Sequence, residues 1–201
     1  MRLINTVLPL LALLAIFGSP APAYFPGSPA HTTRDLSDSS SAGLILQASE
    51  GERRVRRSPP SNVSALAAPF IIKVDRKNGG SPDFFMGYED IPPGKAIARH
   101  YHPHADEILF VHRGSGLASL GSREAVVTAG ETIYIPANTR VSLKNTGTEP
   151  LTIVFLFPQP EVANYFRDAS VAEGERAVPF SPEEFGALRA RHRGHITFEE
   201  R

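Results

Sequence analysis

The sequence predicts an all-β fold, an antiparallel sandwich or barrel, followed by C-terminal helices. Between residues 68 and 158, short β-prone runs alternate with turns rich in Gly, Pro and Asn. Such close spacing is typical of antiparallel sheets and leaves no room for the helices that connect parallel strands. After Pro160 the pattern becomes helical. The 201 residues are enough for one domain with extensions.

The chain begins with the features of a secretory signal peptide. Arg2 supplies a positive charge, residues 7–17 are apolar, and residues 21–23 form a small-residue cleavage site before Tyr24. We therefore expect residues 1–23 to be a signal peptide and the mature protein to be secreted or periplasmic. The apolar run of 11 residues is well short of the ~20 that a spanning helix needs, so stable membrane insertion is not expected. An uncleaved anchor is the alternative.

Residues 24–67 have the composition of an N-terminal extension or linker. Pro, Gly and Ser are frequent up to residue 43, and hydrophobic periodicity is weak. Within this extension, residues 44–46 are expected to form a short strand. Residues 53–57 contain four arginines, which a solvated edge explains best. The alternative is that these arginines contact an anionic ligand or mark a processing site.

Residues 68–158 carry the predicted barrel. Its strands are runs of β-branched, aromatic and other apolar residues, each bounded by turn-forming residues. No repeat of fixed period relates them. The predicted strands are 69–74, 84–88, 95–101, 107–112, 116–119, 124–128, 131–135, 139–144 and 151–157.

Residues 159–201 are expected to form a C-terminal helical extension. A first helix is predicted near 161–168. A second begins at Ser181, because a Ser cap followed by Pro182 and by Glu184 three residues on is a helix start signal, and it is expected to run to about Arg193. His192 and His195 lie among arginines there, so we expect a solvated basic face.

Composition narrows the partners and the metal ligands. Lys plus Arg and Asp plus Glu number 21 each, so the net charge gives no reason to expect nucleic acid as a partner. The chain has no cysteine, so it has no disulfides and a metal site cannot include a cysteine ligand.

One stretch carries the pattern of a metal site. His100 and His102 are two residues apart, so on an extended strand both side chains emerge on the same face. Glu107 follows after a break that allows a carboxylate to fold back toward both imidazoles. Two imidazoles and one carboxylate suit a divalent transition metal.

These residues resemble the cupin superfamily, small antiparallel β-barrels of jelly-roll type. The first cupin motif is Gly, five residues, His-x-His, three or four residues, Glu, six residues, Gly. Gly94, His100, His102, Glu107 and Gly114 fill it without a gap. The resemblance covers roughly residues 68–158 and implies a jelly-roll barrel with a metal centre.

The second cupin motif is Gly, five residues, Pro-x-Gly, two residues, His, three residues, Asn. Gly130, Pro136 and Asn145 fit it. Asn138 stands where Gly is usual, which is tolerable because Asn enters left-handed turn conformations more readily than most residues. Val141 stands where the family places its last metal-binding histidine, and valine cannot coordinate a metal.

The valine leaves three hypotheses open. In the first, His100, His102 and Glu107 bind the metal alone, with open positions for water, substrate or oxygen. In the second, His104 takes part as a further ligand, although Pro103 and the following turn make its direction unpredictable. In the third, the metal site has degenerated and the barrel binds an organic ligand without a metal.

Strand parity predicts the surroundings of the site. If Glu107 points inward, Leu109 and Val111 do too, whereas His112 faces the other way and is not a ligand. Val141 and Leu143 would share the inward face of their strand, together with Thr139. Such an apolar wall favours a hydrophobic or aromatic substrate over a phosphorylated sugar. A place at the border of the pocket is open for Tyr134 and Arg99, beside purely structural roles.

The resemblance implies a cupin with one divalent metal, Fe, Mn, Ni, Cu or Zn, acting on a small organic molecule in a dioxygenase-like reaction, with Glu107 as ligand and base. The signal-peptide features add that this cupin is exported. The alternative is a non-catalytic small-ligand-binding cupin with a degenerate metal site. A third interpretation is a structural or interaction protein, whose extensions could pair with a neighbour's barrel edge, and a homodimer is compatible with all three.

Overall fold

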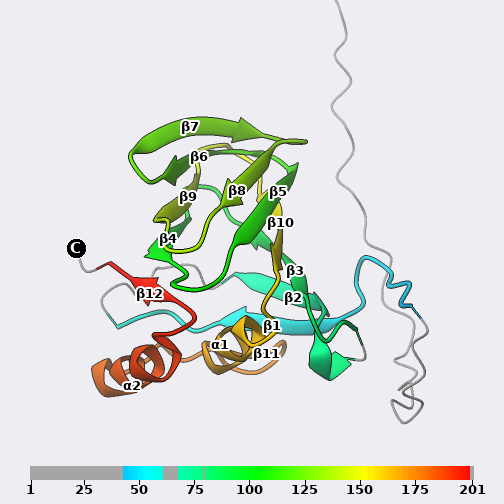
Figure 1. Cartoon of the computed structure of the whole chain (residues 1–201), viewed down its shortest axis with the longest axis vertical. Coiled ribbons are helices and arrows are strands. Elements are labelled where there is room, and N and C mark those ends of the chain that lie inside the picture. Colours follow the sequence, from blue (N-terminus) through cyan, green and yellow to red (C-terminus); the bar gives the residue numbers. More distant parts are fainter. Residues whose placement is uncertain (1–42, 61–67, 79, 200–201) are drawn as a thin grey trace, which may run out of the picture. The chain divides into compact units, whose positions relative to one another are not determined.

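A computed structural model describes residues 43–60, 68–78 and 80–199 (Figure 1). The described residues belong to one compact unit. The predicted signal peptide, residues 1–23, lies outside them.

The described residues form strands and a few short helices (Figure 1). The helices are a 3₁₀ turn, η1 (Arg76–Asn78), and two α-helices, α1 (Val162–Asp168) and α2 (Pro182–His192). The strands are β1 (Glu52–Arg56), β2 (Pro69–Val74), β3 (Phe85–Ile91), β4 (Ala96–Tyr101), β5 (Glu107–Arg113), β6 (Ser115–Leu120), β7 (Arg123–Thr128), β8 (Thr132–Ile135), β9 (Val141–Asn145), β10 (Leu151–Phe157), β11 (Ser170–Ala172) and β12 (Thr197–Phe198).

The strands build two antiparallel sheets, as the all-β prediction requires. One has seven strands in the order β11-β1-β2-β3-β10-β5-β8, and the other has five in the order β12-β4-β9-β6-β7. Neighbours far apart in sequence, such as β3 beside β10 and β4 beside β9, give the crossing connections of a jelly roll. The nine predicted strands are confirmed as β2 to β10, with ends that differ by at most three residues.

The core lies between the inner faces of the sheets and is closed at one end by α1. Four phenylalanine rings pack there, with centroids 5.3 Å apart for Phe85 and Phe155, and 4.9 Å apart for Phe85 and Phe166. Phe157 stacks on Phe85 at 5.7 Å. Phe166 comes from α1, so the C-terminal extension contributes directly to the barrel core.

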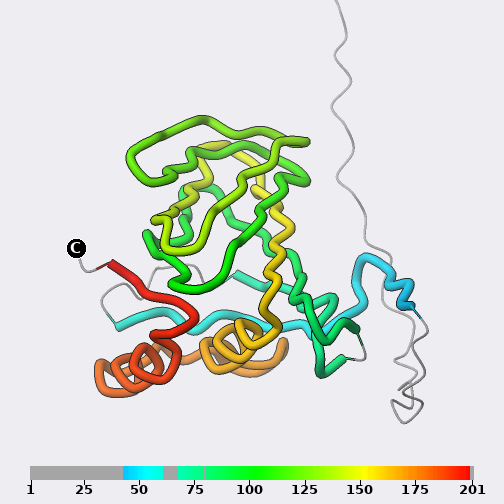
Figure 2. The backbone as a smooth tube through the Cα atoms, viewed as in Figure 1, coloured from blue at the N-terminus to red at the C-terminus, as the bar shows by residue number. Residues whose placement is uncertain are grey.

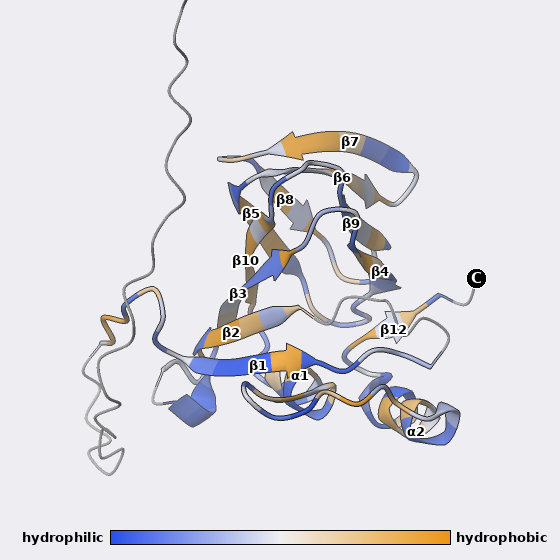
Figure 3. Ribbon diagram, turned by 180° about the vertical axis from the view of Figure 1, so that it is seen from behind, coloured by the Kyte–Doolittle hydropathy of each residue, from blue (hydrophilic) through white to orange (hydrophobic). Residues whose placement is uncertain are grey.

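Most of the arginine-rich run, residues 53–57, forms strand β1. The expectation that this run is a solvated edge was wrong for Arg56. Figure 3 shows β1 as a largely hydrophilic strand beside the hydrophobic β2. Arg56 is paired through two hydrogen bonds of 2.8 Å with Glu89, whose side chain is 1% exposed. Strand pairing carries the arginine inward, because alternate residues of a strand face opposite sides.

The strand predicted at residues 44–46 is absent. These residues have no regular structure, and Ile45 is 95% exposed. The chain next to them is held in a turn, because Lys73 Nζ donates hydrogen bonds of 2.7 Å to the carbonyls of Gln47 and Ala48. Apolar content alone suggested a strand, but among the described residues no strand forms backbone hydrogen bonds with this segment.

The second helix starts as predicted. Ser181 accepts a hydrogen bond from the Glu184 amide, and the Glu184 carboxylate accepts one from the Ser181 amide. The expected solvated basic face was wrong for His192, which is buried because α2 packs on α1 and whose Nε2 lies 2.9 Å from Asp168. Figure 2 shows the chain after α2 returning to the barrel, where β12 pairs with β4.

Candidate metal centre

His100 lies near the end of β4 and His102 just beyond it, and both side chains are buried. Their ring centroids are 5.1 Å apart, and the ring planes are nearly perpendicular. Each ring has its Nδ1 atom near a backbone carbonyl, 2.8 Å from Ala98 O for His100 and 2.6 Å from His195 O for His102. Since a carbonyl only accepts, each Nδ1 carries the proton, and each Nε2 is left with a free lone pair.

Glu107, the first residue of β5, completes the cluster. One ligand atom from each of His100, His102 and Glu107 lies within 4.8 Å of the others. His102 Nε2 and Glu107 Oε2 are 3.5 Å apart, and within the described part of the chain neither atom has a hydrogen-bond partner. Buried polar atoms without partners are costly, and a metal ion would satisfy both. The residues present therefore fit a divalent metal.

Burial sets the protonation states of the cluster. It lowers the pKa of His100 to about 4, and it lowers the pKa of His102 to about 3 with a further contribution from His100. It raises the pKa of Glu107 to about 8, although the positive charge of Arg56 opposes the shift. Near neutral pH both imidazoles are neutral, and Glu107 keeps a proton until a cation replaces it. The contact between His102 and Glu107 is thus not an ion pair.

The walls around the cluster are apolar, as strand parity predicted. Val141 is the register partner of His100 and is 1% exposed. The Phe157 ring packs against His102 at 4.8 Å, and the Phe198 ring lies 5.7 Å from His100. On β5, inward-facing residues are buried and outward-facing ones are exposed, which confirms that His112 faces away from the cluster.

An apolar groove of about 210 Å³ lies beside these walls, between β6, β7 and β8. Leu120 lines it and is the register partner of Val141, which in turn is the partner of His100. Ile133 lines the opposite side, two residues from the Glu107 partner Ile135. The strands thus carry an apolar surface from the groove toward the cluster.

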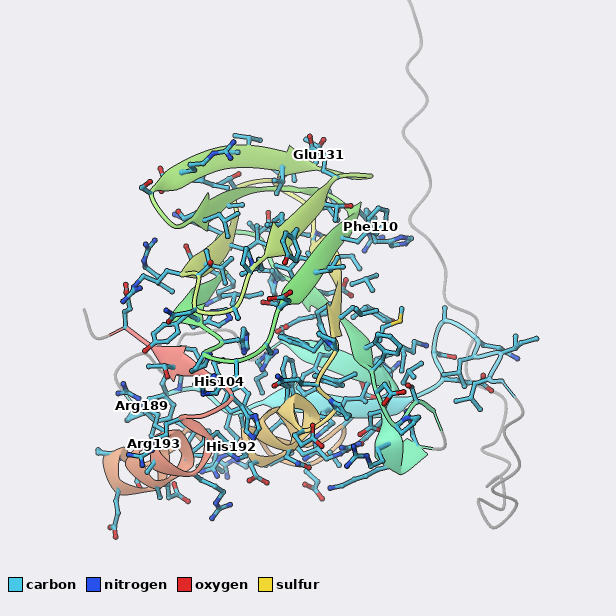
Figure 4. All side chains as sticks on the ribbon, viewed as in Figure 1. His104, Phe110, Glu131, Arg189, His192 and Arg193 are labelled. Carbon is cyan, nitrogen blue, oxygen red and sulfur yellow. The ribbon has the colours of Figure 1, made fainter. Side chains whose placement is uncertain are left out.

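Other expected site residues lie elsewhere. His104 is exposed and is not a member of the cluster, and Figure 4 shows it on the side of the molecule where Arg193 lies. Tyr134, by contrast, does line the apolar groove, and its exposed hydroxyl donates a hydrogen bond to Asp106. Arg99 faces away from its neighbour His100 and binds Glu199.

Two features of the site were not predicted from the sequence. The His195 carbonyl holds His102 from 93 positions away, and Phe198 covers His100. The strand that brings them, β12, has two residues. So short a strand leaves no periodic signal, and a backbone carbonyl leaves no residue-type signal, so neither contact was predictable from sequence pattern.

Comparisons with known proteins agree with this fold. The family described as "Cupin domain" matches residues 87–157. The tetracenomycin polyketide synthase protein TcmJ of Streptomyces glaucescens is 28% identical over 89 residues, which are 42% of this chain and 60% of that protein. Polyketide synthase CurC of Streptomyces cyaneus is 30% identical over 112 residues, 53% of this chain and 73% of that protein.

Solved structures give the same picture. A sugar phosphate isomerase from a cupin superfamily, from Silicibacter pomeroyi, has a TM-score of 0.51 at 21% identity, covering 58% of this chain and 76% of that one. A predicted oxalate decarboxylase from Thermotoga maritima has a TM-score of 0.50 at 18% identity, covering 58% of this chain and 99% of that one. At such low identity the likeness concerns the fold alone.

Proposed function

This chain belongs to the cupin family, and on that premise we propose that it holds one divalent transition metal through His100, His102 and Glu107. The observation that carries the proposal is the pair of buried, unpartnered ligand atoms, His102 Nε2 and Glu107 Oε2, which lie beside a neutral His100. Iron, manganese, nickel, copper and zinc all accept this ligand set.

The proposed reaction is dioxygenase-like, with a small and largely apolar organic molecule as substrate and dioxygen as oxidant, so that both oxygen atoms enter the product. A bound iron, manganese, nickel or copper ion would supply Lewis acidity and redox capacity, whereas zinc would supply Lewis acidity alone. Glu107 serves as ligand once a cation has displaced its proton, and the resulting carboxylate acts as the base when it swings away from the metal. Val141 and Leu120 exclude water from one side. The apolar groove and the polyketide synthase names of two relatives support a hydrophobic or aromatic substrate.

The alternative is a non-catalytic barrel that binds a small ligand and has lost the metal. Val141 favours it, because the side chain opposite His100 offers no donor atom. The two candidates make opposite predictions about metal content, so one measurement separates them.

We include export in the proposal, on the signal-peptide features of residues 1–23. Among the described residues, no helix is both long enough and apolar enough to cross a bilayer.

We also propose a homodimer through the outer face of the larger sheet. Five register rows cross β3, β10 and β5, three of them face outward, and one of these three runs Asp90–Thr152–Arg113. A two-fold axis along β10 would place Asp90 of each copy against Arg113 of the other, so the face is self-complementary in charge. The other two outward rows present apolar side chains, the most exposed being Tyr134, Ile108 and Phe110, and Phe110 is labelled in Figure 4.

Light scattering after size exclusion tests the dimer. Phe110→Glu should give a monomer, whereas Val126→Glu, which changes a still more exposed apolar residue on the other sheet, should leave the dimer intact. A monomeric unmodified chain at high concentration would disprove this interface.

Elemental mass spectrometry of protein purified without chelator or metal-affinity tag tests the metal. We expect about one metal ion per chain, lost in His100→Ala/His102→Ala and kept in His104→Ala/His112→Ala, which removes two exposed histidines instead. No metal after incubation with each of the five ions would leave the ligand-binding alternative. With metal present, oxygen uptake with hydroxylated aromatic compounds tests the reaction, and Glu107→Gln is its negative control.

A further inference from the structure

The last described residues of the chain reach the metal centre. We call residues 194–199 the C-terminal segment. Its β12 pairs with β4 so that Phe198 is the register partner of His100. The Phe198 ring packs 5.7 Å from His100, and the His195 carbonyl lies 2.6 Å from His102 Nδ1. One short segment therefore contacts both histidines of the cluster.

We propose that the C-terminal segment is a positioning element of the metal centre and that its docking and metal binding are coupled. This inference rests on the proposed function above, since it concerns the same site. The positioning groups are the His195 carbonyl and the Phe198 ring, which touch the ligands and not the metal.

The carbonyl acts by fixing the tautomer of His102. A neutral imidazole carries one N–H, and it binds a metal only through its other nitrogen. Because His195 O accepts from Nδ1, the proton stays there and Nε2 faces Glu107. Without a docked segment, the buried Nδ1–H loses its acceptor, and the proton and ring orientation are no longer fixed. Loss of such outer partners typically weakens metal binding by about 10–100-fold.

Ile196 anchors the segment in the core, whereas its outer end is held by weaker contacts that are more easily shifted. Glu199 forms ion pairs with Arg99, at 2.9 Å, and with Arg140, and Arg189 donates to the Phe198 carbonyl at 3.2 Å. Exposed ion pairs of this kind contribute little each. A two-residue strand adds few ladder bonds. If docking of the segment raises the affinity for the metal by some factor, bound metal must raise the equilibrium constant for docking by the same factor.

The test compares zinc affinity, measured by chelator competition, in the full chain and in four variants. A chain ending at Gly194 should bind zinc at least about tenfold more weakly. Glu199→Gln should weaken binding by a smaller factor, and Glu173→Gln should not change it. Glu173 is the matched control, because it pairs with Arg53 at a comparable surface position away from the cluster. His195→Ala keeps the backbone carbonyl and should bind zinc as the full chain does.

Two further measurements distinguish the proposed positioning role from misfolding of a variant. The imidazole ¹⁵N spectrum of the metal-free chain should show His102 protonated at Nδ1, and Glu199→Gln should reduce that population. In the full chain, zinc should slow amide exchange at Glu199, which donates to Arg99 O, while leaving Gly94, which donates to Asn145 O, unchanged.

Each outcome decides one question. If the full chain binds zinc and the shortened, folded chain binds it within about twofold, the positioning role is wrong. The same holds if His195→Ala loses as much affinity as the shortened chain, because the side chain would then be responsible. If the full chain binds no metal, the proposed function fails, while the tautomer spectrum still confirms or disproves the contact between His102 and the segment.

Discussion

Val141 lies directly across from His100 on the neighbouring strand, and its side chain is buried in the same interior. In the family pattern this position carries a histidine. Here the position closes one side of the cluster with two methyl groups. The proposed metal binding would then depend on three ligands and on the groups that orient them.

Replacing Val141 with histidine should strengthen metal retention. The new imidazole would enter opposite His100, where β4 and β9 already align the two positions. A further donor should lower the rate of metal loss to a chelator by about tenfold or more, equivalent to about 1.4 kcal/mol. Overpacking could cost about 1–3 kcal/mol of folding stability. Chelator-exchange kinetics, with thermal unfolding alongside, measure both effects. Unchanged retention in a folded Val141→His protein would place residue 141 outside coordination range.

The sequence was sufficient for the barrel and for the cluster of His100, His102 and Glu107, because both leave local signals. Strand alternation placed Glu107 inward and His112 outward, and the structure agrees. Asn138 at the motif's glycine position has a φ of 61°, the left-handed conformation that asparagine tolerates.

Sequence patterns did not predict burial that depends on contacts between residues distant in the chain. Arg56 and His192 look like surface residues by type, yet partners distant in sequence bury them. Glu89 faces Arg56 across the sheet, and Asp168 meets His192 where α1 and α2 pack together. Neither pairing follows from spacing along the chain, because tertiary packing creates it.

Metal binding near neutral pH should release about one proton. The pKa of Glu107 is raised to about 8 in the metal-free site, so at pH 7 this group is mostly protonated, whereas His100 and His102 are already neutral. A cation must displace the Glu107 proton. Apparent affinity should fall about tenfold per pH unit below 8 and level off above it. Calorimetry in buffers of different ionisation enthalpy measures the proton count. A count near zero at pH 7 would mean that Glu107 is ionised before metal arrives.

Without metal, folding stability should be highest near pH 6.5. The raised pKa of Glu107 means that the folded state holds its proton more tightly than the unfolded state, so stability is lost as pH rises from 4.5 to about 8. The lowered pKa values of His100 and His102 have the opposite effect, and stability is lost as pH falls from 6.5 toward 4 and 3. Two histidines outweigh one carboxyl where the ranges overlap.

Glu107→Gln isolates the alkaline side of this profile. The variant should lose metal binding, and its metal-free form should keep its stability between pH 6.5 and 8, where the unmodified protein declines. Each unit of pKa difference corresponds to about 1.4 kcal/mol. The free energy of unfolding of metal-free Glu107→Gln, relative to the unmodified protein, should therefore rise by on the order of a few kcal/mol across this range. Urea unfolding at several pH values, in the presence of chelator, provides the comparison. Parallel declines in both proteins would show that another group controls this range.

Breaking the buried pair of Arg56 and Glu89 should be far more damaging than breaking an exposed pair on the same strand. Arg56→Met leaves the Glu89 carboxylate in the core with no cation, and losing one partner of a buried pair typically costs about 3–5 kcal/mol. Arg53→Met is the matched control, because Arg53 also lies on β1 but pairs with the half-exposed Glu173, and it should cost less than about 1 kcal/mol.

The double variant Arg56→Met/Glu89→Leu distinguishes charge from packing in that pair. The Arg56 guanidinium lies 4.8 Å from the centre of the Phe70 ring and 4.6 Å from that of Phe166, so an apolar side chain can occupy the same space. Removing both charges should recover most of the stability, since the desolvation cost disappears with them. Chemical denaturation of the unmodified protein, Arg56→Met, Arg53→Met and the double variant measures these differences in the free energy of unfolding. A double variant as unstable as Arg56→Met alone would mean that the arginine stabilises the core through its packing on the rings, and not by neutralising Glu89.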